Sequence, residues 1–187
     1  MNYFSKSSYL YTPLFCEENM WHLTNSLITQ GIKEKEINIL FITNKNKKIT
    51  IFNQLAATNN KAAVWDYHVI LLARIENLHY IFDFDTRLPF PDKPEHYLEH
   101  SLPDNIDNEY SAKFRIISAN AYLKYFSSDR SHMINIIPDA LFPSYPAILS
   151  DHDNQIYLTD LFDIKKKINN TRIFQDKRQL IKWIKNL

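Results

Sequence analysis

Apolar positions near the start of the chain follow a helical period. From Cys16 onward, the side chains that share one helix face are Met20, Trp21, Thr24, Leu27 and Ile28, a spacing typical of an amphipathic helix. The only glycine in the chain, Gly31, follows this run, and glycine is common just past the end of a helix. The pattern predicts a helix that begins at Cys16 and ends before Gly31.

Runs rich in β-branched and aromatic residues follow. Residues 37–43 (INILFIT) and 47–54 (KKITIFNQ) lie on either side of NKNK and predict a β-hairpin. Residues 62–75 and 79–85 predict a second pair of strands, joined at ENL. Alternation along the first strand of this second pair would place Val64, Asp66 and His68 on one face.

The second half of the chain alternates between prolines and periodic segments. Residues 88–110 contain four of the eight prolines and predict a long ordered connection at the surface. Residues 111–128 predict a strand and then a helix, and residues 137–149 a loop with several prolines. The segment from Tyr157 predicts a helix, a short strand and a basic amphipathic helix. The order of elements predicts an α+β domain with a central antiparallel sheet.

Composition and charge limit the class of protein. The chain has 187 residues, of which 45% are hydrophobic and 23% charged, typical of a globular protein. We therefore expect residues 1–187 to form a single domain. A net charge of +1 gives no reason to expect nucleic acid or a membrane as partner. The single glycine excludes glycine-rich phosphate loops.

The compartment follows from the termini and the cysteine count. The first fifteen residues lack the basic and apolar regions of a signal peptide, and no apolar run is long enough to span a bilayer. One cysteine cannot form an internal disulfide, which fits a reducing compartment. We expect a cytoplasmic monomer.

Cys16 is the first candidate for chemistry. A thiol at a helix start lies at the positive end of the helix dipole, beside free backbone N–H groups, which lowers its pKa and supplies oxyanion donors. The alternative is a buried structural cysteine.

Three further polar residues interrupt the second pair of strands. His68 needs a hydrogen-bond partner for its ring nitrogens. The alternative to a catalytic histidine is a core histidine that is bonded to a backbone carbonyl. Asp83 and Asp85 point to one face at a strand end, and the spacing from His68 fits two adjacent strands joined by a short turn. A turn at the strand end, with Asp85 capping Thr86, is the alternative. Cysteine, histidine and aspartate in this order occur in papain-like and transglutaminase-like enzymes.

Longer strings make the assignment more specific. The chain resembles the protein N-terminal glutamine amidohydrolase family in five blocks between about Tyr11 and Ile148: CEENMW, VWDYHV, DFDTRLPFP, KFRIISANAYLKYFSSDRSHM and YPAI. The chain departs from the family in its low glycine content and in residues 134–142.

The resemblance implies both a fold and a reaction. The fold would be a three-layer α/β/α sandwich with a mostly antiparallel sheet and a transglutaminase-like core. The reaction would convert an N-terminal glutamine into glutamate with release of ammonia, through a thioester and with no metal or cofactor. The implied triad is Cys16, His68 and Asp83. The partners would be proteins or peptides with a free N-terminal glutamine, and the product would enter an N-degron pathway.

Recognition of the substrate α-ammonium requires a carboxylate or several carbonyls. Glu18, Asp66 and Asp129 are the candidates that we draw from the sequence. Within SDRSHM we expect Asp129 and Arg130 to form an ion pair that holds their loop against the site. His132 lacks the acid neighbour that His68 has.

Two rival functions remain. HYIFDFDTRL resembles the start of haloacid dehalogenase-type phosphatases, which use the first aspartate as a phosphoryl acceptor with Mg²⁺. These enzymes prefer Thr or Val where Arg87 stands. The other rival is an inactive binding module whose basic last helix meets an acidic partner. The alternative for that helix is a solvated face beside an apolar one; its basic residues are Lys177, Arg178, Lys182 and Lys185.

Overall fold

Five strands form the central sheet in the computed structural model, which describes residues 4–58 and 61–187. Their order is β5-β4-β1-β6-β9, and every neighbouring pair is antiparallel. The bounds are β1 Ile37–Thr43, β4 His68–Ile75, β5 Leu78–Phe82, β6 Lys113–Ser118 and β9 Thr171–Phe174. The predicted antiparallel sheet is confirmed.

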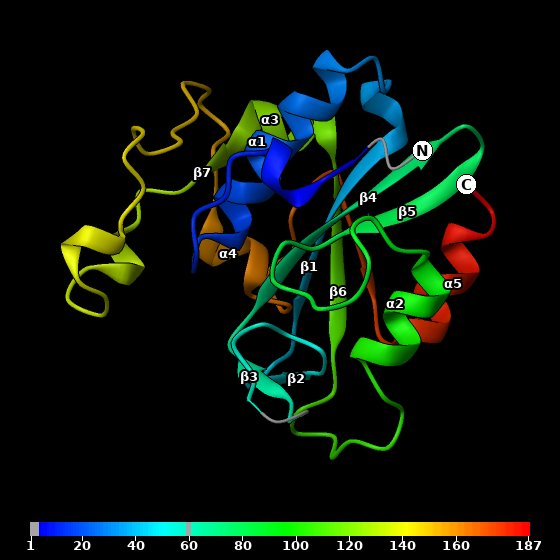
Figure 1. The fold of residues 1–187 in the computed structure, drawn as a ribbon. Coiled ribbons are helices and arrows are strands. Elements are labelled where there is room, and N and C mark those ends of the chain that lie inside the picture. Colours follow the sequence, from blue (N-terminus) through cyan, green and yellow to red (C-terminus); the bar gives the residue numbers. More distant parts are fainter. Residues whose placement is uncertain (1–3, 59–60) are drawn as a thin grey trace.

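Helices cover both faces of this sheet (Figure 1). One face packs against α1 (Cys16–Thr29), α3 (Ala119–Tyr125) and α4 (Leu158–Phe162), and the other against α2 (Pro94–Ser101) and α5 (Lys177–Ile184). Alternation along β1 sends Ile39 and Phe41 into the first core and Leu40 and Ile42 into the second. The α+β sandwich with three layers, expected from the resemblance, is confirmed.

Helix α1 has the predicted bounds. Met20, Leu23 and Leu27 are buried on its inner face, and α1 packs against β4. The chain leaves the helix through Gly31, whose φ of 95° is strained for residues with a Cβ. The helical period therefore identified Met20, Thr24 and Leu27 on the buried face, whereas Trp21 and Ile28 are half-buried and Leu23 was not predicted. Gly31 identified the end of the helix.

The predicted hairpin of residues 37–43 and 47–54 is wrong. Strand β1 pairs with β4 and β6, so both of its edges are occupied. The second segment forms β2 (Ile49–Ile51), which pairs with β3 (Ala63–Trp65) in a separate small sheet. Asn44 turns the chain away from β1, because its side chain accepts the backbone N–H groups of Asn46 and Lys48.

The predicted strand over residues 62–75 is two strands. Strand β3 ends at Trp65 and β4 begins at His68, and Asp66 accepts the backbone N–H of Tyr67 in the bend between them. The expected shared face of Val64, Asp66 and His68 is therefore wrong. Val64 and Asp66 are exposed, whereas His68 is buried.

The segment 88–110 is more than a surface connection. It contains α2, which begins at Pro94, a favourable residue in the first turn of a helix. Tyr97 and Leu98 of this helix are fully buried against the sheet. Prolines on both sides concealed the short helical pattern.

The rest of the predicted order is confirmed. Residues 111–128 form β6 and then α3, and the C-terminal segment forms α4, β9 and α5. The short elements are β7 (Phe126–Ser127), β8 (Ile156–Tyr157) and the 3₁₀ turns η1 (Lys6–Ser8), η2 (Glu34–Glu36), η3 (Ser131–Met133) and η4 (Asp139–Leu141). The segment with η3 and η4 projects from the side of the sandwich, in yellow in Figure 1. Within the described residues, no helix is long and apolar enough to cross a membrane; Met1–Tyr3, part of the segment that lacks signal-peptide features, lie outside them.

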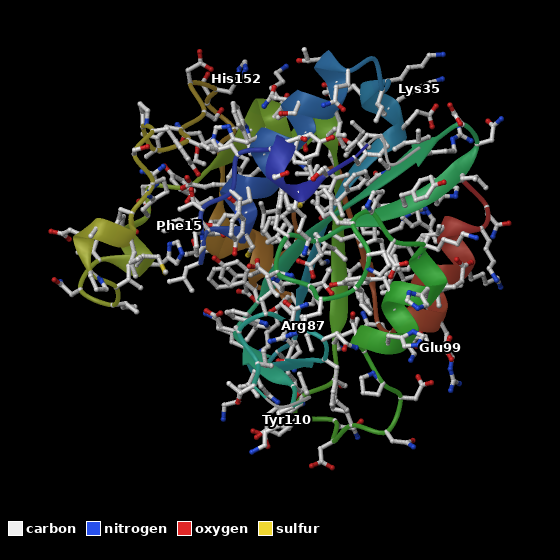
Figure 2. The ribbon with its side chains drawn as sticks, viewed as in Figure 1. Phe15, Lys35, Arg87, Glu99, Tyr110 and His152 are labelled. Atoms are coloured by element: carbon white, nitrogen blue, oxygen red, sulfur yellow. The ribbon has the colours of Figure 1, made fainter. Side chains whose placement is uncertain are left out.

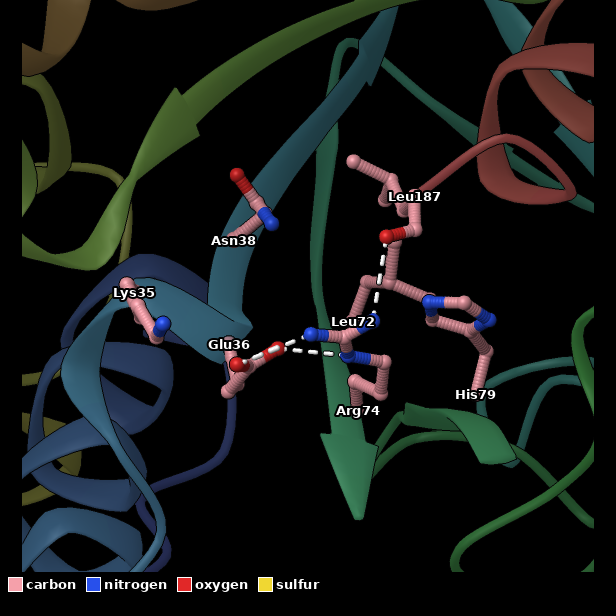
Figure 3. Close-up of a pocket in the computed structure, with 7 residues that line it drawn as sticks. All are labelled: Lys35, Glu36, Asn38, Leu72, Arg74, His79 and Leu187. Atoms are coloured by element: carbon pink, nitrogen blue, oxygen red, sulfur yellow. Dashed lines mark hydrogen bonds and ion pairs between the residues drawn. The ribbon is translucent and has the colours of Figure 1, made fainter. Parts of the chain in front are cut away.

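Strand β4 is tied to the end of the chain. Arg74 on β4 donates two hydrogen bonds to Glu36, at 2.6 and 2.9 Å, and one to the backbone carbonyl of Leu187 at 3.0 Å (Figure 3). A planar guanidinium matches a carboxylate in this bidentate geometry. These bonds hold α5 near β4, on the face opposite α1.

Candidate active site

Cys16 is the first residue of α1, and the local sequence fixes this helix start. Asn19 closes the preceding loop, because its side chain both accepts the N–H and donates to the C=O of Thr12, at 2.8 Å each. Phe15, which Figure 2 labels, is buried. It packs against Phe142, with ring centroids 5.7 Å apart. The thiol is thereby held at the free N–H groups of the first helical turn.

His68 and Asp83 meet because β4 and β5 are neighbours. His68 begins β4, Asp83 follows the end of β5, and the distance from His68 Nε2 to Asp83 Oδ1 is 2.9 Å. Both side chains are almost fully buried. This bond leaves Nδ1 of His68 as the free ring nitrogen.

Asp83 accepts three further hydrogen bonds. Tyr97 O–H and Gln54 Nε2 donate to Oδ2 at 2.7 and 3.0 Å, and the backbone N–H of Asp85 donates to Oδ1 at 2.9 Å. Burial alone would raise the pKa of Asp83, but His68 and these donors outweigh it and lower that pKa to about 2. The group is therefore a carboxylate at neutral pH.

Gln54 is itself held in place by the segment that follows Asp83. Arg87 donates to the backbone carbonyls of Gln54 and Ala57. The side chain of Gln54 is fully buried. The loop after β2 thus supports the carboxylate from the side opposite α1.

Cys16 and His68 line one pocket of about 290 Å³. Its other lining residues are Tyr11, Pro13, Leu14, Leu55, Ala56, Trp65, Asp66, Tyr67, Asp85, His132 and Met133. Trp65 stacks on the His68 ring, with centroids 6.0 Å apart and planes 16° apart. The pocket gives a ligand access to the sulfur and the imidazole, and Asp83 lies behind it.

The environment of the thiol differs from the expectation. Burial raises the pKa of Cys16 well above its ordinary value, and the neighbouring Glu17 raises it further. The predicted lowering of this pKa at a helix start is therefore wrong, because burial outweighs the helix dipole. Desolvation disfavours the His68 imidazolium, but Asp83 outweighs it and the pKa of His68 is raised. The sulfur keeps its proton until a base removes it.

Glu17 is the functional neighbour that sequence reasoning missed. It is fully buried, and its Oε2 accepts hydrogen bonds from Tyr67 O–H at 3.0 Å and from the Cys16 thiol at 3.6 Å. Burial raises the pKa of Glu17 to about 7. An acid directly after a candidate nucleophile was a readable signal. Tyr97 was missed with α2, and Gln54 carries no signal.

Two of the three candidates for binding the α-ammonium lie outside the pocket lining. Glu18 is fully buried and Arg130 binds it in a bidentate ion pair, at 2.9 and 2.7 Å. Asp129 is exposed and accepts two hydrogen bonds from Ser131. The expected ion pair between Asp129 and Arg130 is therefore wrong, although Arg130 does fasten its loop to α1.

Asp66 is the candidate that lines the pocket, where its carboxylate is exposed. Asp85 also lines the pocket, and Tyr11 O–H donates to its Oδ1 at 2.6 Å. His132 lies at the pocket as well, with burial lowering its pKa. Its closest polar contact is Tyr67 O–H at 3.4 Å.

One group of side chains could in principle hold a metal ion. A ligand atom from each of His68, Asp83 and Asp85 lies within 4.8 Å of the others. Each oxygen of Asp83 already accepts two hydrogen bonds. Oδ1 accepts from His68 and the backbone of Asp85, and Oδ2 accepts from Tyr97 and Gln54. These bonds fit a carboxylate that orients an imidazole better than one that binds a cation.

A thiol and an imidazole in one pocket, with a buried carboxylate bonded to that imidazole, are the arrangement of cysteine-dependent acyl-transfer enzymes. The family model described as N-terminal glutamine amidase matches residues 11–183. The chain belongs to this family.

Curated relatives named protein N-terminal glutamine amidohydrolase occur in animals and plants. The human protein is 35% identical over 165 residues, which cover 85% of this chain and 80% of the relative. The relative from Danio rerio is 39% identical over 128 residues, covering 66% and 63%. The relative from Arabidopsis thaliana is 33% identical over 145 residues, covering 73% and 65%.

Proposed function

We propose that this protein hydrolyses the side-chain amide of an N-terminal glutamine, which gives N-terminal glutamate and ammonia. The observation that supports the proposal is the pocket that Cys16 and His68 both line, with His68 Nε2 bonded to Asp83, so that Nδ1 is the ring nitrogen that we assign to the proton of the thiol. The names of the relatives support the choice of substrate.

The first half of the reaction forms a thioester. His68 Nδ1 takes the proton of the Cys16 thiol as the sulfur attacks the carboxamide carbon. Backbone N–H groups in the first turn of α1 stabilise the oxyanion. His68 then returns the proton to the departing nitrogen, the carbon–nitrogen bond breaks, and ammonia leaves.

The second half releases the product. His68 takes a proton from water, the hydroxide attacks the thioester carbon, and the carbon–sulfur bond breaks. The sulfur regains a proton from His68, and the new carboxylic acid loses its proton to solvent and leaves as the carboxylate. Because the pKa of Cys16 is raised, both halves depend on proton transfer by His68.

Asp83 orients His68 throughout. Its carboxylate bonds Nε2–H, which selects the tautomer with a free Nδ1 and stabilises the imidazolium that forms in both halves. Tyr97 and Gln54 hold the carboxylate in turn. No step in this scheme uses a metal or cofactor.

The wider setting is also a proposal. Residues 1–187 act as one catalytic domain, as a cytoplasmic monomer, on proteins or peptides with a free N-terminal glutamine. Near-zero net charge supports the expectation that nucleic acid and membranes are not partners.

The phosphatase alternative requires the first aspartate of DFD to meet a phosphate. Asp83 is 1% exposed and is absent from the pocket lining, which disfavours that role. EDTA distinguishes the two reactions: a Mg²⁺-dependent phosphatase loses its activity, whereas the proposed amidohydrolase keeps it.

The test of the proposal is ammonia release from a peptide that begins with glutamine. A peptide with the same composition and an internal glutamine is the control substrate, and Cys16→Ala is the control variant. We expect ammonia only from the first peptide and only with the parent protein. Equal release from internal glutamine would refute the proposed specificity, and no release from either peptide would support the binding-module alternative.

A further inference from the structure

The proposed reaction requires a group that binds the α-ammonium of the substrate, and no residue has yet been assigned to this role. A substrate with a free N-terminus brings an ammonium group into a partly buried pocket, and burying a cation without a partner is costly. Glu18 is occupied by Arg130, and Asp129 lies away from the pocket lining. Two carboxylates line the pocket, those of Asp66 and Asp85.

Asp85 has a fixed carboxylate with one oxygen available. Oδ1 accepts the Tyr11 O–H at 2.6 Å, and among the described residues none donates a hydrogen bond to Oδ2. The backbone is held as well, since its N–H donates to Asp83 and its C=O accepts from Leu55 N–H at 2.6 Å. A ligand at Oδ2 would therefore meet a preorganised acceptor.

The charges around Asp85 are consistent with this role. Burial raises the pKa of Asp85, while His68 lowers it and Asp83 raises it. Lys6 is the neighbouring lysine, and its Nζ already donates to the backbone carbonyls of Phe84 and Thr86. A substrate ammonium would supply a positive charge in direct contact with the carboxylate.

The distance also fits. Four covalent bonds separate the α-nitrogen of glutamine from its carboxamide carbon, which spans roughly 5 Å when extended. A carboxylate oxygen of Asp85 lies within 4.8 Å of a ring nitrogen of His68, and both residues line the pocket with Cys16. Because these three residues line one pocket, we place the amide carbon at the sulfur and the α-nitrogen at Asp85.

Asp66 is less suited. It is exposed, and an ion pair in open solvent contributes little because water and salt screen it. Its Oδ1 also accepts the backbone N–H of Tyr67. It provides a matched control at the same pocket.

We propose that Asp85, oriented by Tyr11, is the subsite that binds the α-ammonium of the N-terminal glutamine. This inference rests on the proposed function and adds the residue that sets its specificity. Internal and N-acetylated glutamines lack the charge that Asp85 binds, so they do not reach the sulfur in a productive pose.

The test compares two peptides and three variants. The peptides are a glutamine-initiated peptide and its des-amino analogue, in which hydrogen replaces the α-amino group. The variants are Asp85→Asn, Tyr11→Phe and the control Asp66→Asn. Steady-state ammonia release gives kcat and KM for each pair.

We expect the parent protein to prefer the free amine, and Asp85→Asn to lower kcat/KM for that peptide by roughly 10²-fold, mainly through KM. The same variant should change kcat/KM for the des-amino peptide by less than about threefold. Tyr11→Phe should give a smaller loss with the same selectivity, and Asp66→Asn should keep the preference of the parent protein for the free amine. Alkylation of Cys16 by iodoacetamide should not become slower in Asp85→Asn, because that reagent carries no ammonium and the Asp85 carboxylate raises the thiol pKa.

Three results would overturn the subsite. An equal loss for both peptides in Asp85→Asn would mean that Asp85 acts through the catalytic groups. A loss specific to the free amine in Asp66→Asn would assign the ammonium to Asp66, and a parent protein that treats both peptides alike would remove the need for a subsite. A parent protein that is inactive on the glutamine-initiated peptide would instead refute the proposed function.

Discussion

Replacing Asp83 by asparagine removes one charge from the group that orients His68 and keeps its shape. Asp83 accepts hydrogen bonds from His68, Tyr97, Gln54 and the backbone of Asp85. An amide offers one oxygen and one NH₂ group, so one of the two positions then presents a donor to groups that already donate. The variant therefore loses the charge and gains a mismatch in hydrogen-bond polarity.

The magnitude follows from the hydrogen bond between the Asp83 carboxylate and His68, at 2.9 Å. A hydrogen bond to a charged group contributes about 1.5–3 kcal/mol, which corresponds to roughly 10–10² in rate if the imidazolium of the transition state needs this charge. A wrong His68 tautomer adds to this loss; the same change in a serine protease triad costs about 10⁴. We expect Asp83→Asn to lower kcat by roughly 10²–10⁴.

The assay is ammonia release at saturating glutamine-initiated peptide. Asp85→Asn is the first control, and we expect its kcat to change by less than about tenfold because its role is in binding. Asp92→Asn is the second control: Asp92 is also buried and bonded to a histidine, His96, at 2.7 Å, and lies outside the pocket lining. Its kcat should match that of the parent protein.

A second prediction for Asp83→Asn concerns the stability of the protein in acid. The pKa of Asp83 is lower in the folded chain than in the unfolded one, so its contribution is present above about pH 4 and is lost as the pH falls towards 2. In urea titrations, the free energy of unfolding of Asp83→Asn should lack this part of the dependence on acid pH.

The ammonia-release assay also has an outcome that contradicts the assignment. If Asp85→Asn were inactive and Asp83→Asn kept the parent kcat, the assignment of the orienting acid would be refuted.

Three further substitutions test the neighbours of the site. Cys16→Ser should abolish ammonia release while lowering the melting temperature less than Leu23→Ala, a core truncation that costs about 2–5 kcal/mol; an equal drop would make Cys16 structural. Glu17→Gln should move the midpoint of Cys16 alkylation to lower pH, because the Glu17 carboxylate raises the thiol pKa, and a midpoint that stays or rises would contradict this coupling. Arg130→Met should lower the free energy of unfolding by about 3–5 kcal/mol in urea titrations, since it leaves Glu18 buried without a cation; a change below about 1 kcal/mol would mean that the pair contributes little.

Periodicity predicted what depends on neighbours in sequence. The helix from Cys16 to the residues before Gly31 is readable because its apolar face repeats along a single element. The proximity of His68 and Asp83 is readable because a short turn joins adjacent strands. In both cases local geometry carries the information.

Pairing between distant segments was not readable. The hairpin failed because β1 takes β4 and β6 as partners, which depends on tertiary packing and not on the residues at the turn. The predicted partner of Arg130 was wrong for the same reason. The neighbouring Asp129 accepts a hydrogen bond from Ser131. The guanidinium of Arg130 binds Glu18, which is 112 positions away in the sequence. From the sequence alone, the neighbouring residue is the natural candidate for an ion pair. In the fold, Arg130 and Glu18 are both buried, and a buried charge needs a partner of opposite charge.

The prediction that the pKa of the Cys16 thiol is lowered was wrong because the helix terminus and burial act on this pKa in opposite directions. The sequence shows that Cys16 starts a helix, but only the fold shows that its thiol lies against the fully buried Glu17, which also accepts a hydrogen bond from the buried Tyr67. Desolvation then dominates. The consequence is a mechanism that depends on His68 as a base.

The most direct test of the central claim is the mass of a glutamine-initiated peptide after incubation with the protein. The account predicts the mass increase of a single NH₂-to-OH exchange, located at residue 1 by fragmentation, and no change in the N-acetylated peptide. It also predicts that Cys16→Ala leaves both peptides unchanged. An unmodified glutamine peptide, or equal conversion of the acetylated one, would contradict the claim that this pocket deamidates free N-terminal glutamine.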